Sequence, residues 1–312
     1  TPGKAFQVAI AGPLVSFGLF GLLSLLHQTL NPQSPWSVLS GDLAHMNLVL
    51  ALFNLIPGLP LDGGQILKSA VWKATGSRFT GVHWAARVGQ ALGWLAVALG
   101  LLTAILMGEP GGFWIALLGW FGLRNAYTYD RFTDLQEILL QLQAKDAMTR
   151  DFRVVDAEQS IRGFADDYVV ATTHAPAYFA ASGGRYRGLV KVDDLNTLER
   201  SEWERQSVKQ MAHPLSDIPT VRETTALPEV IQILETENLN FITVLSPADA
   251  VSGIVDRGDI VRAVGERMNL QISAEDIRRI KEEGEFPETF QLQAIAKAVL
   301  PDLKASSGSK GL

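Results

Sequence analysis

The sequence predicts an α-helical polytopic membrane domain, with about four transmembrane helices in this chain, followed by a soluble α+β domain. Charge is the first observation behind this prediction, because residues 1–123 hold only 3 of the 33 acids and 5 of the 27 bases. The formal net charge of −6 therefore divides into +2 for this part and −8 for residues 124–312. Six of the seven tryptophans also lie in the first part. The acidic character of the second part argues against nucleic acid as a partner.

Apolar runs within the first 123 residues predict the transmembrane helices, and they cover residues 5–26, 43–57, 88–107 and 113–123. The first run carries no charge and is long enough to cross a hydrocarbon core about 30 Å thick. The second and fourth runs are short, and either could be a core helix of a soluble protein if it stood alone. Four such runs with almost no charge on them favour a membrane domain.

Basic residues predict how this domain is oriented. The linkers 31–42 and 108–112 carry no Lys or Arg, whereas residues 62–87 carry four. Loops rich in Lys and Arg stay on the cytoplasmic side of a membrane. We therefore expect a multi-pass protein of the cell (inner) membrane, with residues 62–87 and everything after residue 124 in the cytoplasm.

The soluble part contains an internal repeat whose copies are spaced about 65 residues apart. The copies end alike, in Gly188–Val190 and Gly253–Val255, each followed four residues later by an acid. Each copy reads as a short α+β unit that cannot bury its sheet alone, so the two are expected to pack face to face. The predicted division of the chain is a membrane domain at 1–129, an amphipathic connector helix at 130–143, repeat copies at 144–200 and 207–265, and a helical extension with a disordered tail at 266–312.

This repeat resembles the paired CBS-domain module, also called a Bateman module, over roughly residues 144–265. The resemblance implies that Asp194 and Asp259 would hold the ribose hydroxyls of an adenosine nucleotide. Lys191 and Asp256 stand where the family usually has Ser or Thr facing phosphate. Lys191 would attract a phosphate, whereas Asp256 would repel it. The alternative for each late acid is a helix cap after a strand.

Asp62 is the most informative single residue in the membrane part. It lies directly after an apolar run, in the segment Asn54–Gly64 that contains two prolines and ends in two glycines. A carboxylate at hydrocarbon depth costs roughly 2.5–3.5 kcal/mol, so it usually faces a polar cavity, a partner charge or a metal ion. The prolines and glycines break the helix and free backbone groups that the protein itself must satisfy. The alternative is an ordinary capping Asp followed by a glycine turn.

The membrane part resembles the site-2 protease family of intramembrane zinc metalloproteases. Two stretches carry the resemblance: Asn54–Gly64, with its Leu-Asp-Gly-Gly ending, and Ile10–Ser16, which contains Ala-Gly-Pro. The resemblance implies that Asp62 would be the third protein ligand of a catalytic Zn²⁺. Asn54 would be a catalytic residue that hydrogen-bonds the substrate backbone or the developing oxyanion. The substrate would be a membrane-anchored protein, cut within a transmembrane segment in the lipid bilayer.

One departure from this family concerns histidine. The family uses a His-Glu-x-x-His helix, which provides two zinc ligands and a general base. None of the five histidines belongs to such a pattern; they are His27, His45, His83, His174 and His213. This chain alone therefore holds an incomplete zinc site, and we expect the missing segment upstream of Thr1. The alternative is a family member that has lost catalysis.

The expected function is the C-terminal part of a zinc-dependent intramembrane endopeptidase. Its CBS pair would be a cytosolic regulatory module that responds to a ligand or to homodimerisation. Two alternatives remain from other classes: a CBS-regulated transporter or channel with Asp62 in its ion path, and a catalytically inactive membrane scaffold. The chain contains no cysteine, which excludes disulfides and thiolate metal sites.

Overall fold

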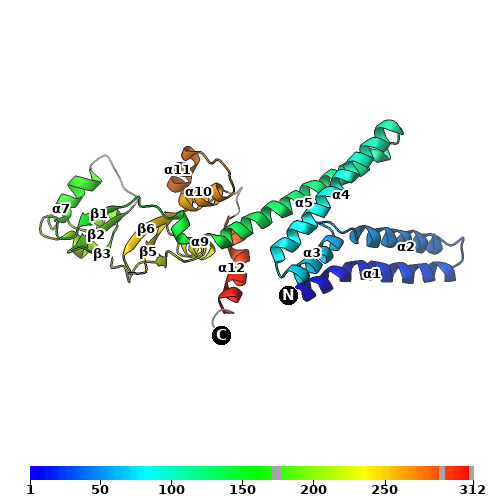
Figure 1. The fold of residues 1–312 in the computed structure, drawn as a ribbon, viewed down its shortest axis with the longest axis horizontal. Coiled ribbons are helices and arrows are strands. Elements are labelled where there is room, and N and C mark those ends of the chain that lie inside the picture. The colour runs from blue at the N-terminus through cyan, green and yellow to red at the C-terminus, as the bar shows by residue number, and fades with distance from the viewer. Residues whose placement is uncertain (171–176, 288–291, 309–312) are drawn as a thin grey trace. The chain divides into compact units, whose positions relative to one another are not determined.

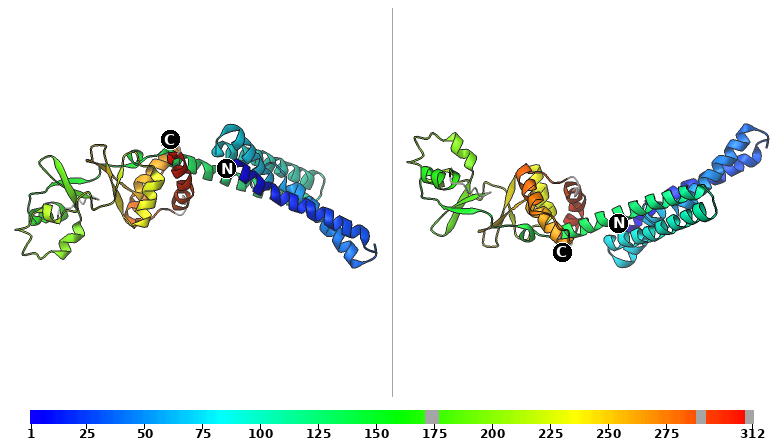
Figure 2. Two further views of the ribbon diagram at one scale, coloured as in Figure 1. Left: turned by 90° about the horizontal axis from the view of Figure 1, so that it is seen from below. Right: turned by 90° about the horizontal axis from the view of Figure 1, so that it is seen from above.

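The computed structural model describes residues 1–170, 177–287 and 292–308, and these divide into two compact units, Thr1–Asp134 and Leu135–Leu312. The first is helical, and the helices that build it are α1 (Pro2–Thr29), α2 (Pro35–Asn54), α3 (Asp62–Thr75), α4 (Arg78–Leu106) and the start of α5 (Gly111–Gln141). α1 and α2 lie side by side as a hairpin (Figures 1 and 2), and α3 packs on both α1 and α4.

Within the described residues, three helices are long and apolar enough to cross a membrane: α1, α2 and α4. At most 22% of the apolar window in each of them is buried, so most of their apolar side chains face outwards. Trp36 illustrates this, because 70% of its surface is exposed. Long helices with apolar exposed faces are expected in lipid and not in water. The prediction of a polytopic helical membrane domain is confirmed.

Helix α5 contains two segments that the sequence predicts to be separate elements. The apolar run at 113–123 and the expected connector at 130–143 lie largely on one continuous helix, Gly111–Gln141. No proline or glycine occurs between residues 123 and 141, so nothing local interrupts the helix. The boundary between the two compact units, at Asp134 and Leu135, falls inside α5.

The second unit contains the two repeat copies. The first comprises β1 (Arg153–Asp156), α7 (Ile161–Phe164), β2 (Tyr178–Ser182) and β3 (Arg185–Val190), and the second comprises β4 (Thr220–Arg222), α9 (Leu227–Thr236), β5 (Phe241–Leu245), β6 (Val251–Asp256) and α10 (Arg257–Arg267). The sheet orders are β1-β2-β3 and β4-β5-β6. In both, the first pair of strands is parallel, the second is antiparallel, and the antiparallel pair contains a register shift. The copies therefore share one topology.

The copies contact each other through matching backbone bridges. Thr149, just before β1, exchanges hydrogen bonds of 2.9 and 3.0 Å with Ile254 on β6. His213, ahead of β4, exchanges hydrogen bonds of 2.8 Å with Leu189 on β3. Leu189 and Ile254 also belong to one buried apolar cluster together with Phe179. Each copy thus covers the sheet of the other.

Short helices and a C-terminal extension complete the second unit. α6 (Ala144–Ala147) and α8 (Val208–Met211) precede the two copies, and α11 (Ala274–Glu283) and α12 (Leu292–Gly308) follow them. α12 packs on α9 through buried Leu292, Ile295 and Val299. The tail expected to be disordered overlaps the end of α12, and residues 309–312 lie outside the described residues.

Candidate metal-binding carboxylate and ligand cleft

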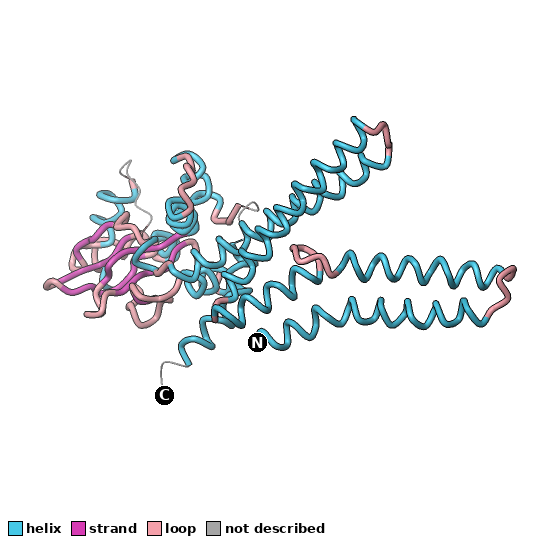
Figure 3. Tube along the Cα trace, turned by 45° about the vertical axis from the view of Figure 1, so that its right-hand side comes forward, coloured by secondary structure: helices cyan, strands magenta, loops and turns pink. Residues whose placement is uncertain are grey.

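Asp62 is the first residue of α3, and a folded-back loop places it there. The loop, residues 55–61, follows the end of α2 at Asn54 and is drawn in pink between α2 and α3 (Figure 3). It contains a cis peptide bond between Leu59 and Pro60. The Leu59 backbone N–H donates to the Ala85 carbonyl of α4 at 3.2 Å, which ties the loop to that helix. This bond satisfies a backbone group that the break in the helix leaves free.

Gly63 and Gly64 allow this loop to fold over the start of α3. A Cβ built on Gly63 would collide with the carbonyl oxygens of Leu55 and Ile56, and one on Gly64 would collide with the backbone of Gly58 and Leu59. Only hydrogen atoms fit at these two positions. The glycines therefore permit a tight approach of two backbone segments directly after Asp62.

The carboxylate of Asp62 faces helix α1. A Cβ built on Gly12 would stand 2.6 Å from Asp62 Oδ2 and 3.6 Å from its Cγ. Gly12 lies in the Ala-Gly-Pro stretch, so the structure brings together the two segments that carry the site-2 protease resemblance. The backbone N–H groups at the start of a helix also favour a negative charge at this position.

Asn54, the other candidate residue in this region, is the last residue of α2, and it is partly buried. An apolar cavity of about 360 Å³ lies beside the loop, with Leu59, Pro60, Leu61, Gly89 and Leu92 among its lining residues. Asn54 and Asp62 are absent from that lining. Both candidate residues therefore flank the loop, and the apolar cavity lies next to it.

A catalytic zinc needs three protein ligands. Among the residues that the structure describes, no group of three or more His, Cys, Asp or Glu side chains is placed to hold a metal ion. His27 contacts the Ser37 carbonyl at 2.7 Å and His83 pairs with Asp130 at 2.7 Å, whereas His174 lies outside the described ranges. Asp62 is thus one suitable donor, and the described residues do not complete a zinc site.

In the second unit, Asp194 lies in a 3₁₀ turn (Val192–Thr197) that follows β3. Its Oδ2 lies 2.7 Å from His213 Nε2, and 32% of its side chain is exposed. A cleft of about 370 Å³ opens next to it, lined by residues of both copies that include Lys191, Asp193, Pro219, Asn240 and Thr243. Lys191 therefore reaches the cleft directly, whereas the neighbouring Asp193 and not Asp194 lines it.

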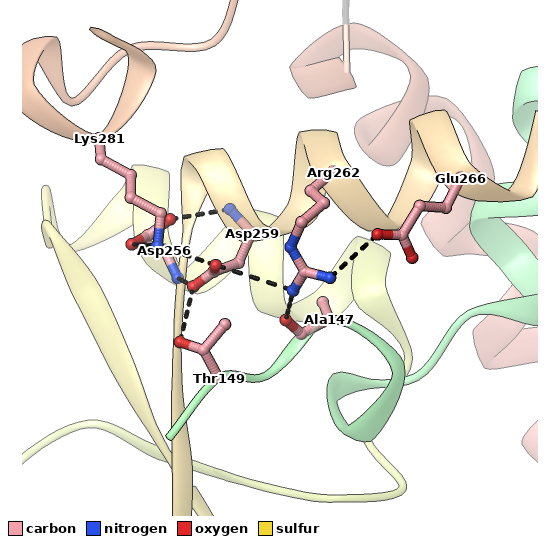
Figure 4. Close-up of polar contacts among 7 residues, drawn as sticks. All are labelled: Ala147, Thr149, Asp256, Asp259, Arg262, Glu266 and Lys281. Carbon is pink, nitrogen blue, oxygen red and sulfur yellow. Dashed lines mark hydrogen bonds and ion pairs between the residues drawn. The ribbon is translucent and has the colours of Figure 1, made fainter. Parts of the chain in front are cut away.

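Asp259, the matching acid of the second copy, is 1% exposed, and both of its carboxylate oxygens accept hydrogen bonds (Figure 4). Its Oδ1 accepts a hydrogen bond from Lys281 Nζ at 2.8 Å. Its Oδ2 accepts from Thr149 Oγ1 and from the Asp256 backbone N–H, both at 3.3 Å. Asp256 in turn accepts from the Asp259 backbone N–H at 2.8 Å, which completes a capping box at the start of α10. The sequence left open a cap at Asp259; the structure places the cap at Asp256, and Asp259 completes the capping box as the third residue of the helix.

Burial and ion pairing together shift the pKa values of two residues in this cluster. Burial raises the pKa of Asp259, the negative charge of Asp256 adds to the rise, and the hydrogen bond from Lys281 opposes it. Burial also acts to lower the pKa of Lys281, but its hydrogen bonds to Asp259 and Asp256 outweigh that effect and the pKa is raised. Lys281 Nζ also lies 2.9 Å from Asp256 Oδ2. Lys281 thus pairs with both carboxylates, and Arg262 Nη2 also lies 3.8 Å from Asp259 Oδ1.

Sequence reasoning did not single out Lys281. It is one basic residue in the amphipathic helix α11, and neither its spacing nor its neighbours distinguish it from Arg278 or Arg279. Its partner Asp259 lies 22 positions away in the chain. Its role follows from the packing of α11 on α10.

Comparisons with known proteins agree with both parts of this description. Residues 21–96 match Peptidase family M50, and residues 208–266 match the CBS domain. The chain is 37% identical to "Putative zinc metalloprotease sll0528" of Synechocystis sp. over 265 residues, which is 85% of this chain and 70% of that protein. It is 31% identical to "Putative zinc metalloprotease Rip3" of Mycobacterium tuberculosis, over 85% of this chain and 68% of that protein.

A solved structure is also similar. The site-2 protease from Methanocaldococcus jannaschii is 29% identical and aligns with a TM-score of 0.32, over 40% of this chain and 54% of that one. This chain therefore spans about half the length of that solved protein.

Proposed function

The chain belongs to peptidase family M50, the site-2 protease family, and from this membership we propose that it is the C-terminal part of a zinc-dependent intramembrane endopeptidase. It cleaves transmembrane segments of membrane-anchored proteins. Its membrane unit lies in the cell (inner) membrane, and the unit that contains the CBS domain lies in the cytoplasm. The exposed apolar helices of the first unit and the basic residues between 62 and 87 support this placement.

The observation that carries the proposal is the position of Asp62. An acid stands at the start of a helix, in a unit of apolar helices, against the glycine of the Ala-Gly-Pro stretch. Asp62 is partly buried, and an ionisable side chain among the apolar helices of a membrane protein is usually functional. Asp62 serves as one metal ligand, and Asn54 at the other end of the same loop hydrogen-bonds the substrate backbone or the oxyanion.

The remaining zinc ligands and the general base come from a segment outside residues 1–312. The described residues supply one suitable donor, and the chain covers 70% of its cyanobacterial relative, which leaves room for such a segment. Zinc held by three protein ligands leaves a coordination position for water and lowers the pKa of that water towards neutrality. The residues of this chain hold Asp62 in place and position the substrate backbone.

The CBS pair is a regulatory module. The cleft beside Lys191 takes a ligand of the adenosine nucleotide class. Lys191 can attract a phosphate there, and Asp193 with several amide or hydroxyl side chains can bind hydroxyl groups. Homodimerisation through the CBS pair is a second route by which the module acts on the protease. The shared topology of the two repeat copies supports the assignment of the module.

The test uses the upstream-extended protein and a single-span model substrate. We expect Asp62→Asn to lower the rate of cleavage by at least about 100-fold, because the amide is a poor zinc ligand. The same change at Asp42, an exposed acid of α2, is the matched control and should leave cleavage unchanged. Metal analysis should find zinc in the wild-type protein and less in Asp62→Asn. Equal cleavage by the two variants would remove Asp62 from the mechanism.

A further inference from the structure

Asp194 and Asp259, the acids that follow the last strand of each repeat copy, occupy equivalent places. Each contacts the residue that forms the backbone bridge to the other copy: Asp194 contacts His213 at 2.7 Å, and Asp259 contacts Thr149 at 3.3 Å. Thr149 bridges to Ile254 and His213 to Leu189 in the same antiparallel manner. A ligand that used Asp194 in one half of the pair would therefore use Asp259 in the other.

The two acids differ in their access to solvent. Asp194 keeps 32% of its side chain exposed, whereas Asp259 keeps 1%. Both oxygens of Asp259 already accept hydrogen bonds, from Lys281 on one side and from Thr149 and the Asp256 backbone on the other. The hydroxyls of a ribose could bind Asp259 only after Lys281 had left.

The approach of helix α11 to this cluster depends on Gly258. A Cβ built on Gly258 would stand 2.7 Å from Lys281 Cγ and 3.0 Å from the carbonyl oxygen of Ile277. Ile280, next to Lys281, is buried. The missing side chain at Gly258 thus lets α11 lie directly on the start of α10, with the ammonium group between the two carboxylates (Figure 4).

The charges at the two matching positions are opposite. Lys191 follows β3 and lines the open cleft of about 370 Å³, whereas Asp256 ends β6 and pairs with Lys281 at 2.9 Å. A phosphate is attracted to Lys191 and repelled by Asp256. One half of the pair thus offers Lys191 to a phosphate, beside Asp193 in the same cleft, whereas the acid of the other half is already paired with a cation of the chain itself.

We infer that Lys281 is a built-in counter-ion through which helix α11 closes the second half-site of the CBS pair, so that the pair takes its anionic ligand at the cleft beside Lys191. The stoichiometry of one ligand per chain rests on the proposed ligand-binding role of the CBS pair. The closure itself rests only on the contacts of α11 with the start of α10, which are those of Lys281, Ile280 and Gly258. The two parts can therefore fail separately.

The first experiment tests the closure by hydrogen exchange in the full chain, purified in detergent. Lys281→Met should raise amide exchange in α11 by roughly tenfold or more, because the ion pairs that dock the helix are lost. Arg279→Met is the matched control, since Arg279 lies on the same helix and makes a local pair with Asp276. Unchanged exchange in Lys281→Met would overturn the closure.

Loss of Lys281 leaves two carboxylates together, which could unfold the unit. The triple variant Lys281→Met, Asp256→Asn and Asp259→Asn removes these charges and keeps the side-chain shapes. It should stay folded and should still show faster exchange in α11. If α11 were as protected from hydrogen exchange in this variant as in the wild type, the closure by Lys281 would also be contradicted.

The second experiment measures binding of AMP to the full chain by equilibrium dialysis. We expect one AMP per chain, and we expect Lys191→Ala to weaken binding roughly tenfold. Lys209→Ala, an exposed lysine on α8, is the control and should bind normally. Two AMP molecules per wild-type chain would overturn the single-cleft inference. Absence of AMP binding would instead contradict the proposed nucleotide-binding role. The closure would then be tested by the hydrogen-exchange experiment alone.

Discussion

Gly12 and Asp62 show how one missing methyl group can set the position of a candidate metal ligand. A Cβ atom on any larger residue at position 12 would lie only 2.6 Å from Asp62 Oδ2. The crowded atom is the end of a flexible side chain, so the carboxylate can turn away at little cost to the fold. A substitution at Gly12 should therefore move the carboxylate and leave the helices in place.

We expect Gly12→Ala to lower cleavage by the upstream-extended protein by about 100-fold, the effect typical of a catalytic group displaced by about 1 Å. Zinc affinity should fall as well, whereas the melting temperature should not, since Ala favours a helix over Gly. Gly18→Ala and Gly21→Ala are matched controls on α1, because a Cβ at either position meets open space. Equal activity of Gly12→Ala and Gly18→Ala would show that the contact with Asp62 is unimportant.

The raised pKa of Lys281 predicts how the stability of the CBS unit depends on pH. Its pKa in the folded protein is raised above the ordinary value of 10.5, so its ion pairs stabilise the fold fully below that pH. This contribution is lost as the pH rises through the raised pKa. As the pH rises above about 10.5, the melting temperature of wild type should fall more steeply than that of Lys281→Met. Parallel curves for the two proteins, followed by circular dichroism, would contradict the prediction.

Helices α4 and α5 pack closely because small residues meet between them. Built Cβ atoms at Gly93 and Gly119 would lie 2.9 Å from Leu123 Cβ and 2.8 Å from Ala96 Cβ, respectively. In a membrane, where lipid solvates apolar side chains as well as protein does, such close backbone packing is a main source of helix association. The Gly-x-x-x-Gly spacing of Gly89 and Gly93 on α4 is part of this contact face.

Overpacking this face should destabilise the membrane unit. We expect Gly119→Ala to reduce its free energy of unfolding by about 1–3 kcal/mol, because the added methyl group forces the two helices apart. Gly122→Ala is the matched control on α5, since nothing lies within 4 Å of its Cβ. Unfolding in detergent micelles, followed by tryptophan fluorescence, measures both variants. A Gly119→Ala protein as stable as Gly122→Ala would show that the contact can relax without cost.

The two compact units of the chain have separate cores. Leu59, Val82, Ala85 and Ala86 form a buried cluster of the first unit, whereas the second unit buries residues of both repeat copies and of α12. The C-terminal extension contributes to the second core, since Ile295 on α12 is fully buried. A change in one core is therefore expected to act within its own unit.

Ile295→Ala should lower the stability of the CBS unit by about 2–5 kcal/mol, the cost of removing a large buried side chain. Hydrogen exchange should rise throughout α9 and α12, and exchange in α1 to α4 should not change. Lys297→Ala, on the same helix, is the control for altered helix propensity. Faster exchange in the membrane helices of Ile295→Ala would show that the two units unfold together.

Several features could be predicted from local patterns, because each depends on residues close together in the chain. The apolar runs predict α1, α2 and α4, and Pro57, Pro60, Gly63 and Gly64 predict the break beside Asp62. The endings Gly188–Val190 and Gly253–Val255 predict the duplicated α+β unit. The continuity of α5 was missed because the change from apolar to amphipathic character suggested two elements, although no helix-breaking residue separates them.

Composition, motifs and repeats in the sequence alone thus determined the membrane and CBS character of the chain and its family resemblance, and they singled out Asp62 as the candidate metal ligand. Only the tertiary structure decided which residues face these acids. Gly12 contacts Asp62 across 50 positions of chain, and Lys281 reaches Asp259 from a helix that follows the repeat. Sequence patterns report the period and chemistry of neighbours along the chain, whereas these contacts depend on how separate helices pack against one another.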